Sequence, residues 1–350
     1  MQGAAMTIKN QKLVPGQKLP RRKKSKREDL ESLYSQFCTK DRVLVTIDPD
    51  PDSIASAIAL KRLLWHKVQS TTIGMTRPIK RLNNLTMVRL LRLPLIHINT
   101  VEQTKDYDKF VLVDGQPYHN DLFSQISYTA IIDHHPLTRV VEAPVVDIRP
   151  DYGATSTMFT QYLKIAKVKP FKALATALLY GVKTDTRNFE RNTLEEDIEA
   201  FHYLYPLANH YILRKIEISD LSLKDLKLFE RAIDKKHVVR NRIFTHLDHV
   251  PSADVLVIIA EFLLKVHDIS WSIVSGIVED KLVVIVRNDG YRKDAGKSLT
   301  KAFGSIGCAG GHQAMARAEV PMENLVRAME KKPTSLAIEQ FIRKRLSPFS

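Results

Sequence analysis

The stretch VTIDPDPDSIASAIAL, residues 45–60, joins a β-type run to an apolar helical run through three aspartates at alternate positions. RVLVTI (42–47) is rich in β-branched residues, which is typical of a buried strand. SIASAIALKRLLW (53–65) has small and apolar residues at helical spacing, with Ser53 as a suitable N-cap. The stretch therefore predicts a strand–turn–helix unit whose turn carries Asp48, Asp50 and Asp52.

The alternation of strands and helices continues along the chain. We predict strands at residues 70–75, 110–115, 128–135 and 143–148, and helices at residues 27–38, 80–91, about 155–166 and 171–183. This order predicts an α/β fold with a doubly wound parallel sheet. Because such sheets bind ligands beyond the carboxyl ends of their strands, the residues that follow these strands are candidate site residues.

A second, smaller α+β pattern follows a charged helical stretch. It contains a helix (ADVLVIIAEFLL, 253–264), two strands joined by a hairpin turn at Glu279–Asp280, and a glycine-rich loop, GSIGCAGGHQA (304–314). A length of 350 residues also favours two domains. We expect a basic, disordered tail at 1–27, a first domain at 28–192, a helical connector at 193–235, a second domain at 236–330 and a C-terminal helix or tail at 331–350.

The composition is that of an ordinary globular protein, with 44% hydrophobic and 26% charged residues. The two cysteines, Cys38 and Cys308, give neither a disulfide framework nor zinc-ligand spacing, which suits a reducing compartment. The longest apolar run, residues 255–264, is shorter than the ~20 residues of a membrane span. The N-terminus lacks the apolar core of a signal peptide, so we expect a cytoplasmic protein.

The net charge of +14 is unevenly distributed. Residues 1–27 contain nine Lys and Arg and no acid, so the remaining residues carry 44 basic against 39 acidic side chains, or +5. The run RRKKSKR (21–27) could contact the phosphates of RNA or of anionic lipid, or it could be a solvated leader. Both interpretations stay open.

Acidic and imidazole side chains follow three of the predicted strands. Asp114 follows FVLV, and Asp133, His134 and His135 end TAIIDHH; Asp185 comes after a further apolar stretch. Carboxylates crowded at one sheet edge raise one another's pKa unless cations neutralise them. Aspartate oxygens with imidazole suit Mn²⁺ or Mg²⁺, and a pair of such ions can activate water for in-line displacement at phosphorus.

Other interpretations of these motifs remain. Asp48 and Asp52 could be turn and cap residues, since Asp-Pro repeats favour turns. GATSTM (153–158) is typical of a helix N-terminus, where an ordinary cap is more common than an anion site. GYRKDAGKS (290–298) imitates a phosphate-binding loop, but five residues separate its glycines where the motif needs four.

Several motifs, in order from about residue 42 to 320, resemble those of the DHH/DHHA1 phosphoesterases. The first four are DPDPDSIASAIAL, VLVDGQP, IIDHHP and GVKTDTRNF, and the second domain adds VIVRNDG and FGSIGCAGGHQAMA. The layout is most similar to the nano-RNase and pAp-phosphatase branch. The resemblance implies a DHH domain, residues 28–192, with the catalytic metals, and a DHHA1 domain, residues 236–330, that binds substrate.

The resemblance also implies roles for individual residues. Asp50 and Asp114 would bind a first metal ion, and a second would be bound by Asp52, Asp114, His134 and Asp185. Asp114 and His135 would be catalytic, with His135 at the scissile phosphate and Asp133 orienting a neighbouring histidine. The far phosphate or terminal nucleotide would be held by Arg287, Gly310, Gly311 and His312.

One position departs from the family pattern. The first motif usually begins with a metal-binding histidine three residues before its proline, and Thr46 occupies that position here. Threonine is a poor ligand, so the first site would be weaker, differently built or empty. Asp48 is an additional carboxylate that could substitute for the histidine, and its direction cannot be read from the sequence. Arg187 stands where glycine is common, either as a phosphate contact or facing solvent.

We therefore expect a phosphoesterase with two Mn²⁺ (or Mg²⁺) ions. Its substrates would be short oligonucleotides, linear dinucleotides or 3′-phosphoadenosine 5′-phosphate. One alternative is a single-strand DNA exonuclease, which the lack of an evident aromatic, basic groove disfavours. Another is a weakened relative that binds nucleotide or RNA without turnover. The preferred nucleic acid, the partner of the tail and the oligomeric state, a homodimer included, stay open.

Overall fold

The computed structural model describes residues 25–190, 193–291, 293–330 and 333–346. The chain divides between Asp220 and Leu221 into two compact units, which we call unit 1 (residues 1–220) and unit 2 (residues 221–350). Most of the predicted basic tail, residues 1–27, lies outside the described residues, which begin at Ser25.

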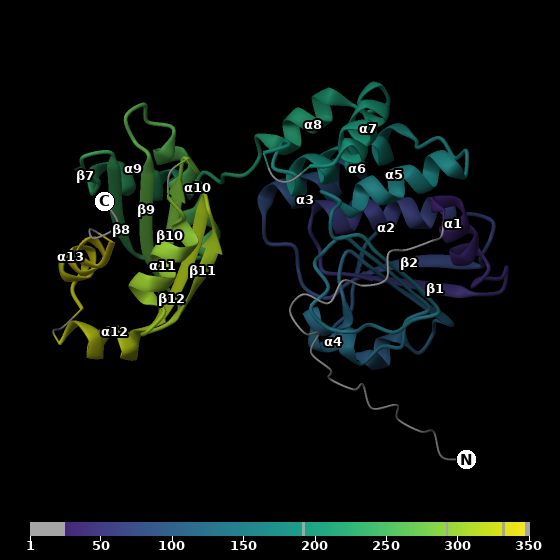
Figure 1. The fold of residues 1–350 in the computed structure, drawn as a ribbon, viewed down its shortest axis with the longest axis horizontal. Coiled ribbons are helices and arrows are strands. Elements are labelled where there is room, and N and C mark those ends of the chain that lie inside the picture. Colours follow the sequence, from purple (N-terminus) through teal and green to yellow (C-terminus); the bar gives the residue numbers. More distant parts are fainter. Residues whose placement is uncertain (1–24, 191–192, 292, 331–332, 347–350) are drawn as a thin grey trace, which may run out of the picture. The chain divides into compact units, whose positions relative to one another are not determined.

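Unit 1 alternates strands and helices, as the sequence predicts (Figure 1). Its strands are β1 (Arg42–Ile47), β2 (Ser70–Met75), β3 (Ile96–His97), β4 (Lys109–Val113), β5 (Ala130–Asp133) and β6 (Val145–Ile148). Its α-helices are α1 (Lys26–Tyr34), α2 (Pro51–Leu63), α3 (Leu82–Leu91), α4 (Asp121–Ser124), α5 (Thr155–Ile165), α6 (Lys172–Asp185), α7 (Glu195–Leu204) and α8 (His210–Glu217). Short 3₁₀ turns cover Val101–Thr104, Pro117–His119 and Tyr205–Leu207.

The strands of unit 1 form one parallel sheet in the order β3-β2-β1-β4-β5-β6. Because β1 pairs with β2 on one side and with β4 on the other, the strand order reverses between β1 and β4. In doubly wound sheets, the crevice beyond the carboxyl ends at such a reversal is the usual ligand site. The aspartates of the DPDPD turn and Asp114 follow these two strands.

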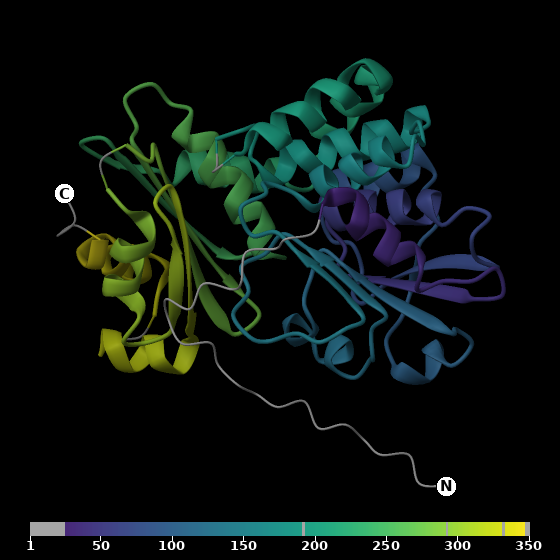
Figure 2. The ribbon, with the colours of Figure 1, turned by 45° about the vertical axis from the view of Figure 1, so that its right-hand side comes forward.

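Hydrophobic cores cover both faces of this sheet. Val43, Val45 and Ile47 of β1 belong to a large core that includes buried side chains of α1, α2, α5, α6 and α8, whereas Leu44 belongs to a smaller core with Phe123 of α4. Figure 1 shows α2, α5 and α6 on one side of the strands and α4 on the other. The teal helices α5–α8 remain together on that first side after rotation (Figure 2). The fold is therefore a three-layer α/β/α arrangement.

The start of α2 differs from the prediction. Ser53 is not the N-cap: α2 begins at Pro51, and Asp50 caps it by accepting the backbone N–H of Ser53 at 2.8 Å. The Ser53 hydroxyl in turn accepts the backbone N–H of Asp50 at 3.0 Å. Proline suits the first helical position because its backbone has no N–H to leave unpaired. Asp52 therefore lies in the first turn of the helix.

Unit 2 contains a mixed sheet in the order β11-β12-β10-β9-β8-β7. Its strands are β7 (His237–Val239), β8 (Arg242–His249), β9 (Trp271–Val278), β10 (Lys281–Asn288), β11 (Cys308–His312) and β12 (Met315–Pro321). Its helices are α9 (Leu226–Asp234), α10 (Ala253–Leu264), α11 (Ala295–Phe303), α12 (Met322–Met329) and α13 (Ser335–Leu346). Only the β8–β9 pairing is parallel. Buried residues of α11, α12 and α13 pack on one face, and those of α9 and α10 on the other.

The predicted glycine-rich loop, residues 304–314, is partly wrong. Cys308–His312 form the edge strand β11, paired antiparallel with β12. The segment lacks the alternation of apolar residues that marks a strand. Its glycines instead allow its backbone to lie close to the backbone of β12. A Cβ on Gly311, which has a φ of +153°, would lie 2.2 Å from the carbonyl oxygen of Met315.

The charged helical stretch, residues 193–235, is shared between the units. Leu204 of α7 and Leu213 of α8 are buried in the core of unit 1, whereas Ala232 of α9 is buried in unit 2. Among the helices of the described ranges, none has the length and apolar character needed to cross a membrane.

Candidate metal centre

Three carboxylates and one imidazole, each from a different segment, meet at the carboxyl edge of the unit 1 sheet. Asp52 comes from the first turn of α2, Asp114 directly follows β4, His134 directly follows β5, and Asp185 is the last residue of α6. The ring nitrogen His134 Nε2 lies 3.1 Å from Asp185 Oδ2, 3.7 Å from Asp114 Oδ1 and 4.0 Å from Asp52 Oδ2. We call these residues, together with Asp50 and His135, the acid cluster.

Two overlapping groups in the acid cluster have the spacing of metal ligands. One joins Asp52, His134 and Asp185, and the other joins Asp114, His134 and His135, each with ligand atoms within 4.8 Å of one another. His134 Nε2 is buried and has no hydrogen-bond partner among the described residues. A buried nitrogen that faces three carboxylates is the arrangement expected of a ligand to a divalent cation.

The backbone at the start of α5 holds two of these carboxylates. Asp52 accepts the backbone N–H of Thr155 on one oxygen and that of Ser156 on the other, both at 2.7 Å. The Thr155 hydroxyl donates to Asp114 Oδ1 at 2.7 Å. The helix N-terminus therefore does bind an anion, and that anion is a side chain of the protein itself.

The same segment fixes the orientation of His134. His134 Nδ1 lies 3.0 Å from the carbonyl oxygen of Tyr152. A carbonyl oxygen only accepts, so Nδ1 carries a proton and Nε2 is the nitrogen that faces the carboxylates. Residues 152–156 thus orient three members of the acid cluster, and the ring of His134 has the orientation that a metal ligand requires.

Asp197 in the first turn of α7 fixes this segment from behind. Its buried carboxylate accepts the backbone N–H groups of Gly153 and Leu194, each at 2.9 Å, and the hydroxyl of Thr157 at 2.6 Å. A Cβ on Gly153 would lie 2.6 Å from the Thr186 side chain and 2.8 Å from Asp197 Oδ2. Only glycine fits there, because the two side chains close over the backbone.

Asp133 is buried behind the histidines. Its Oδ1 accepts His135 Nδ1 at 2.8 Å and the backbone N–H of His134 at 2.9 Å, and its Oδ2 accepts the Gln116 amide at 2.7 Å. Burial raises the pKa of Asp133, but the hydrogen bond and charge of His135 outweigh it and the pKa is lowered. The bond leaves His135 Nε2 as the nitrogen available to a bound group, and 42% of the His135 side chain is exposed.

The acid cluster is electrostatically costly without cations. Burial, followed by the charge of Asp185, raises the pKa of Asp50 to about 6 and the pKa of Asp52 to about 7. Burial and the charge of Asp52 also raise the pKa of Asp114 well above its ordinary value. Divalent cations would offset this repulsion, so the donor set fits the metal that the motifs predict.

Asp114 also has an unusual backbone. Its φ of +59° is in the left-handed region, which aspartate tolerates better than most residues. The backbone N–H of Asp114 donates to the carbonyl of Ile132 at 2.9 Å, which ties the residue to β5. Left-handed non-glycine residues are held in place only where the surroundings fix them, and they concentrate at functional sites.

Thr46 and Asp48 lie apart from the ligand groups. The Thr46 hydroxyl is buried and hydrogen-bonded to the Tyr128 hydroxyl at 3.2 Å, beside the small core on the α4 face. Asp48 forms an ion pair with Arg77, which follows β2. Neither residue belongs to the two ligand groups found among the described residues.

The predicted substrate-binding residues lie in unit 2. Arg287 of β10 and His312 of β11 both pair with Met315 of β12, so their side chains share one face of the sheet. The Arg287 guanidinium contacts Glu261 of α10 at 3.3 Å. Gly310 and Gly311 precede His312 on the same edge strand, and a Cβ at Gly310 would meet nothing within 4 Å.

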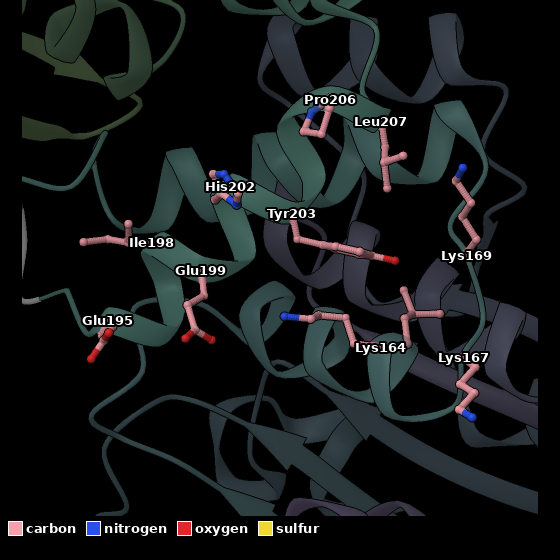
Figure 3. Close-up of a pocket in the computed structure, with 11 residues that line it drawn as sticks. Lys164, Lys167, Lys169, Glu195, Ile198, Glu199, His202, Tyr203, Pro206 and Leu207 are labelled. Carbon is pink, nitrogen blue, oxygen red and sulfur yellow. The ribbon is translucent and has the colours of Figure 1, made fainter.

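A hollow in unit 1 lies between the end of α5 and α7, separate from the acid cluster (Figure 3). It encloses about 1010 Å³, and Lys164, Lys167 and Lys169 line one side of it. Ile198, Tyr203 and Leu207 supply apolar surface, and no member of the acid cluster lines it. The hollow is therefore not the metal centre.

Sequence reasoning missed several residues that support the acid cluster. Residues 153–158 were interpreted as a helix N-terminus with Thr155 or Ser156 as an ordinary cap, but Ala154 is the N-cap and the N–H groups of Thr155 and Ser156 bind Asp52. Gln116 lies within the VLVDGQP motif but had no predicted role, and nothing in the motifs marked Asp197. Their partners lie far away in the sequence: Asp197 is 44 residues from Gly153, and Thr155 is 103 residues from Asp52. An aspartate in the first turn of a predicted amphipathic helix is the one sequence signal that could have indicated Asp197.

Comparison with known proteins supports the motif assignment. Residues 42–182 match the DHH family, N-terminal domain. The chain is 33% identical over 305 residues to an uncharacterized protein of Methanocaldococcus jannaschii, a match that covers 87% of this chain and 63% of that protein. The chain thus spans less than two thirds of the length of this relative.

Two further known proteins are similar to one part of the chain or to its fold alone. A match of 123 residues, 33% of this chain and 19% of the relative, is 31% identical to the cyclic-di-AMP phosphodiesterase GdpP of Geobacillus thermodenitrificans. The solved structure of an exopolyphosphatase-related protein from Bacteroides fragilis is similar with a TM-score of 0.68 and 14% identity, over 92% of this chain and 96% of that one.

Proposed function

We propose, since residues 42–182 match the DHH family, N-terminal domain, that the protein is a metal-dependent phosphoesterase whose reaction takes place at the acid cluster. The observation that carries the proposal is the buried His134 Nε2, which lies within 4.0 Å of carboxylate oxygens from three different segments. The phosphodiesterase that resembles part of this chain supports the same class of reaction.

The proposed ligands are the residues that the geometry gathers. Asp52, His134 and Asp185 would hold one Mn²⁺ or Mg²⁺ ion, and Asp50 and Asp114 would hold a second. Bound there, such ions lower the pKa of water and neutralise charge on a phosphate. The second ion would bind more weakly, because Thr46 stands in place of a histidine and is engaged by Tyr128.

The surrounding side chains have separate tasks in this proposal. Thr155 and Ser156 hold Asp52 in place, and Asp133 holds His135 with its Nε2 exposed to the scissile phosphate. We assign to Arg287, Gly310, Gly311 and His312 of unit 2 the binding of a second phosphate or of a terminal nucleotide. Short oligonucleotides, linear dinucleotides and 3′-phosphoadenosine 5′-phosphate carry the groups that these residues would recognise.

The decisive experiment follows the hydrolysis of an end-labelled linear diadenylate. We expect release of mononucleotide that requires Mn²⁺, stops on addition of chelator, and is lost in Asp114→Ala. The matched control is Asp121→Ala, which removes an exposed aspartate of α4 outside the acid cluster and should retain full activity. Equal activity of the two variants would contradict the proposed site.

A second candidate function rests on Thr46. Because its hydroxyl is engaged by Tyr128 and lies outside the ligand groups, the protein could hold a single ion and bind nucleotide without turnover. Calorimetry with Mn²⁺ gives the number of ions bound, and a nucleotide-binding assay with chelator present distinguishes the two candidates. Nucleotide binding that survives chelation, with no product formed, would favour the binding protein over the enzyme.

A further inference from the structure

A second hollow lies in unit 2, and its lining is strongly basic. It encloses about 1010 Å³ between the β7–β8 turn, the start of β9, the loop after β10 and the helix α13. Five of its lining side chains are cationic and one, Asp289, is acidic. We call this site the basic pocket, and its cations are Arg240, Arg242, Lys293, Arg343 and Lys344.

Two acids lie close to these cations. Glu339, which lies one helical turn before Arg343, contacts its guanidinium at 3.7 Å. Asp289 accepts the backbone N–H of Tyr291 at 3.1 Å. The described lining remains basic in composition, and a concave basic surface attracts anions more strongly than a flat surface does.

Arg242 is the cation whose surroundings most require an anion. It is 7% exposed, its guanidinium lies 5.5 Å from the centre of the Trp271 ring, and its Nη1 donates to the carbonyl of Leu346 at 2.8 Å. No carboxylate of the described residues forms an ion pair with it. Burial, followed by the charge of Arg240, lowers the pKa of Arg242. A buried cation without a counter-charge is costly, and a bound phosphate would remove that cost.

The pocket also offers surfaces suited to bases. Tyr291 lines the pocket and is 80% exposed, so its ring gains little stability from burial and is accessible to a ligand. The side chain of Asn288 holds both ends of the segment that carries Tyr291. Its amide N–H donates to the carbonyl of Lys293 at 2.8 Å, and its amide oxygen accepts the backbone N–H of Gly290 at 3.0 Å. Cations that track phosphates beside an exposed ring are typical of single-strand binding sites.

We propose that the basic pocket binds single-stranded nucleic acid, with a backbone phosphate beside Arg242 and Arg343 and a base stacked on Tyr291. The site lies in unit 2, and neither Arg287 nor the glycine-histidine strand lines it. The metal-ligand groups found among the described residues do not include any residue of this pocket, so we expect its binding to persist without divalent cations. Its residues come from four separate segments, and for that reason no groove was evident in the sequence.

The test measures binding of a fluorescent twelve-nucleotide oligouridylate to the full chain by anisotropy, with chelator present to prevent hydrolysis. Two arginines provide a matched pair of charge reversals. Arg343 of α13 and Arg327 of α12 each contact a glutamate four residues earlier at 3.7 Å, and only Arg343 lines the pocket. We expect Arg343→Glu to weaken binding about 10-fold or more and to reduce the salt dependence by about one phosphate contact, with Arg327→Glu changing binding less than about two-fold.

The base-stacking part of the proposal has its own readouts. Tyr291→Ala should weaken oligouridylate binding about five-fold or more, since base–aromatic stacking contributes about 1–3 kcal/mol. Photocrosslinking of an oligonucleotide that contains 4-thiouridine should label peptides with Trp271 or Tyr291, which separates the pocket from the basic residues 1–27. Crosslinks confined to residues 1–27, or equal losses in Arg343→Glu and Arg327→Glu, would overturn the proposal. Inorganic polyphosphate that binds as tightly as RNA, with Tyr291→Ala silent, would overturn the assignment to nucleic acid.

Discussion

Asp52 Oδ2 accepts the backbone N–H of Thr155 at 2.7 Å, across 103 residues of sequence. This bond joins the first turn of α2 to the first residue of α5, so the carboxylate is held by a second helix rather than by its own. The positive end of the α5 dipole also offsets part of the charge that burial makes costly. The candidate metal centre is consequently supported by a segment that contains none of its ligands.

Replacing Asp197 should weaken metal binding without touching a ligand. Asp197→Ala leaves the N–H groups of Gly153 and Leu194 without their acceptor, and the segment that orients Asp52 and His134 loses its support. We expect the Mn²⁺ affinity to fall about 10–100-fold, as it does for residues that orient ligands. Calorimetry on folded protein, checked by circular dichroism, measures this change.

The matched control for Asp197→Ala is Thr104→Val, at the end of the 3₁₀ turn Val101–Thr104. It removes a buried hydroxyl that donates to the carbonyl of Val101 at 2.7 Å and lies outside residues 152–156. A similar loss of Mn²⁺ affinity in both variants would indicate general destabilisation. Partial recovery in Asp197→Asn, whose amide oxygen still accepts a hydrogen bond, would support positioning.

A methyl group at Gly153 should destabilise unit 1. Gly153→Ala places a Cβ within 3 Å of both Thr186 and Asp197, so backbone or side chains must move, at a cost of about 1–3 kcal/mol. Gly115→Ala is the control in the same unit, because its Cβ would meet no atom closer than 3.7 Å. Denaturant unfolding of both variants gives the comparison, and equal stabilities would show that the segment relaxes freely.

Asp48→Asn should leave metal binding intact. Asp48 pairs with Arg77 rather than with the ligand groups, so we expect the Mn²⁺ affinity to change less than about two-fold. The guanidinium of Arg77 would lose its partner, and the KM for a phosphorylated substrate should change while metal stoichiometry does not. A fall of about ten-fold or more in Mn²⁺ affinity would instead identify Asp48 as the replacement for the missing histidine ligand.

Unit 2 should lose stability as the pH falls below neutrality. Burial, opposed by the charge of Asp248, lowers the pKa of His246 from 6.5 to about 4. The unfolded chain therefore takes up a proton near pH 6.5 that the folded chain takes up only near pH 4. The contribution of His246 is complete above pH 6.5 and is lost as the pH falls toward 4, by about 1.4 kcal/mol per pH unit.

The variant His246→Gln isolates this contribution from that of other titrating groups. Gln lacks the titration and can still hydrogen-bond to Ser275, the partner of His246 at 3.0 Å. Between pH 7 and pH 5, the free energy of unfolding should fall by about 2 kcal/mol more in the natural protein than in the variant. Identical pH profiles would show that His246 is protonated in the folded state at its ordinary pKa.

Local sequence patterns were sufficient for most elements of the fold. Residues 42–47, 70–75 and 253–264 were predicted as elements with the bounds that the structure has, because their apolar periodicity is continuous. The start of α2 was misplaced by the competing caps Asp50 and Ser53. The strand at Cys308–His312 was missed because pairing with β12, and not side-chain pattern, specifies it.

The candidate site divides in a similar way. Four members of the acid cluster could be proposed as neighbours from the sequence. Asp52, Asp114 and His134 follow predicted parallel strands or their turns, and Asp185 lies in the GVKTDTRNF motif after a further apolar stretch. The residues that support them could not be proposed, since hydrogen bonds between α5, α7 and the ligands depend on how helices pack. The direction of the Asp48 side chain could not be predicted either, because its ion-pair partner Arg77 comes from the segment after β2.

The position of Asp197 has a practical consequence for any shortened form of this protein. The family match ends at residue 182, before Asp185 at the end of α6 and Asp197 on α7. A fragment trimmed to that boundary would keep the parallel sheet and the DPDPD turn yet lose Asp185, a candidate ligand, and Asp197, which holds the segment that orients three others. A fragment designed for metal-binding experiments should therefore extend to the junction at Asp220, where unit 1 ends.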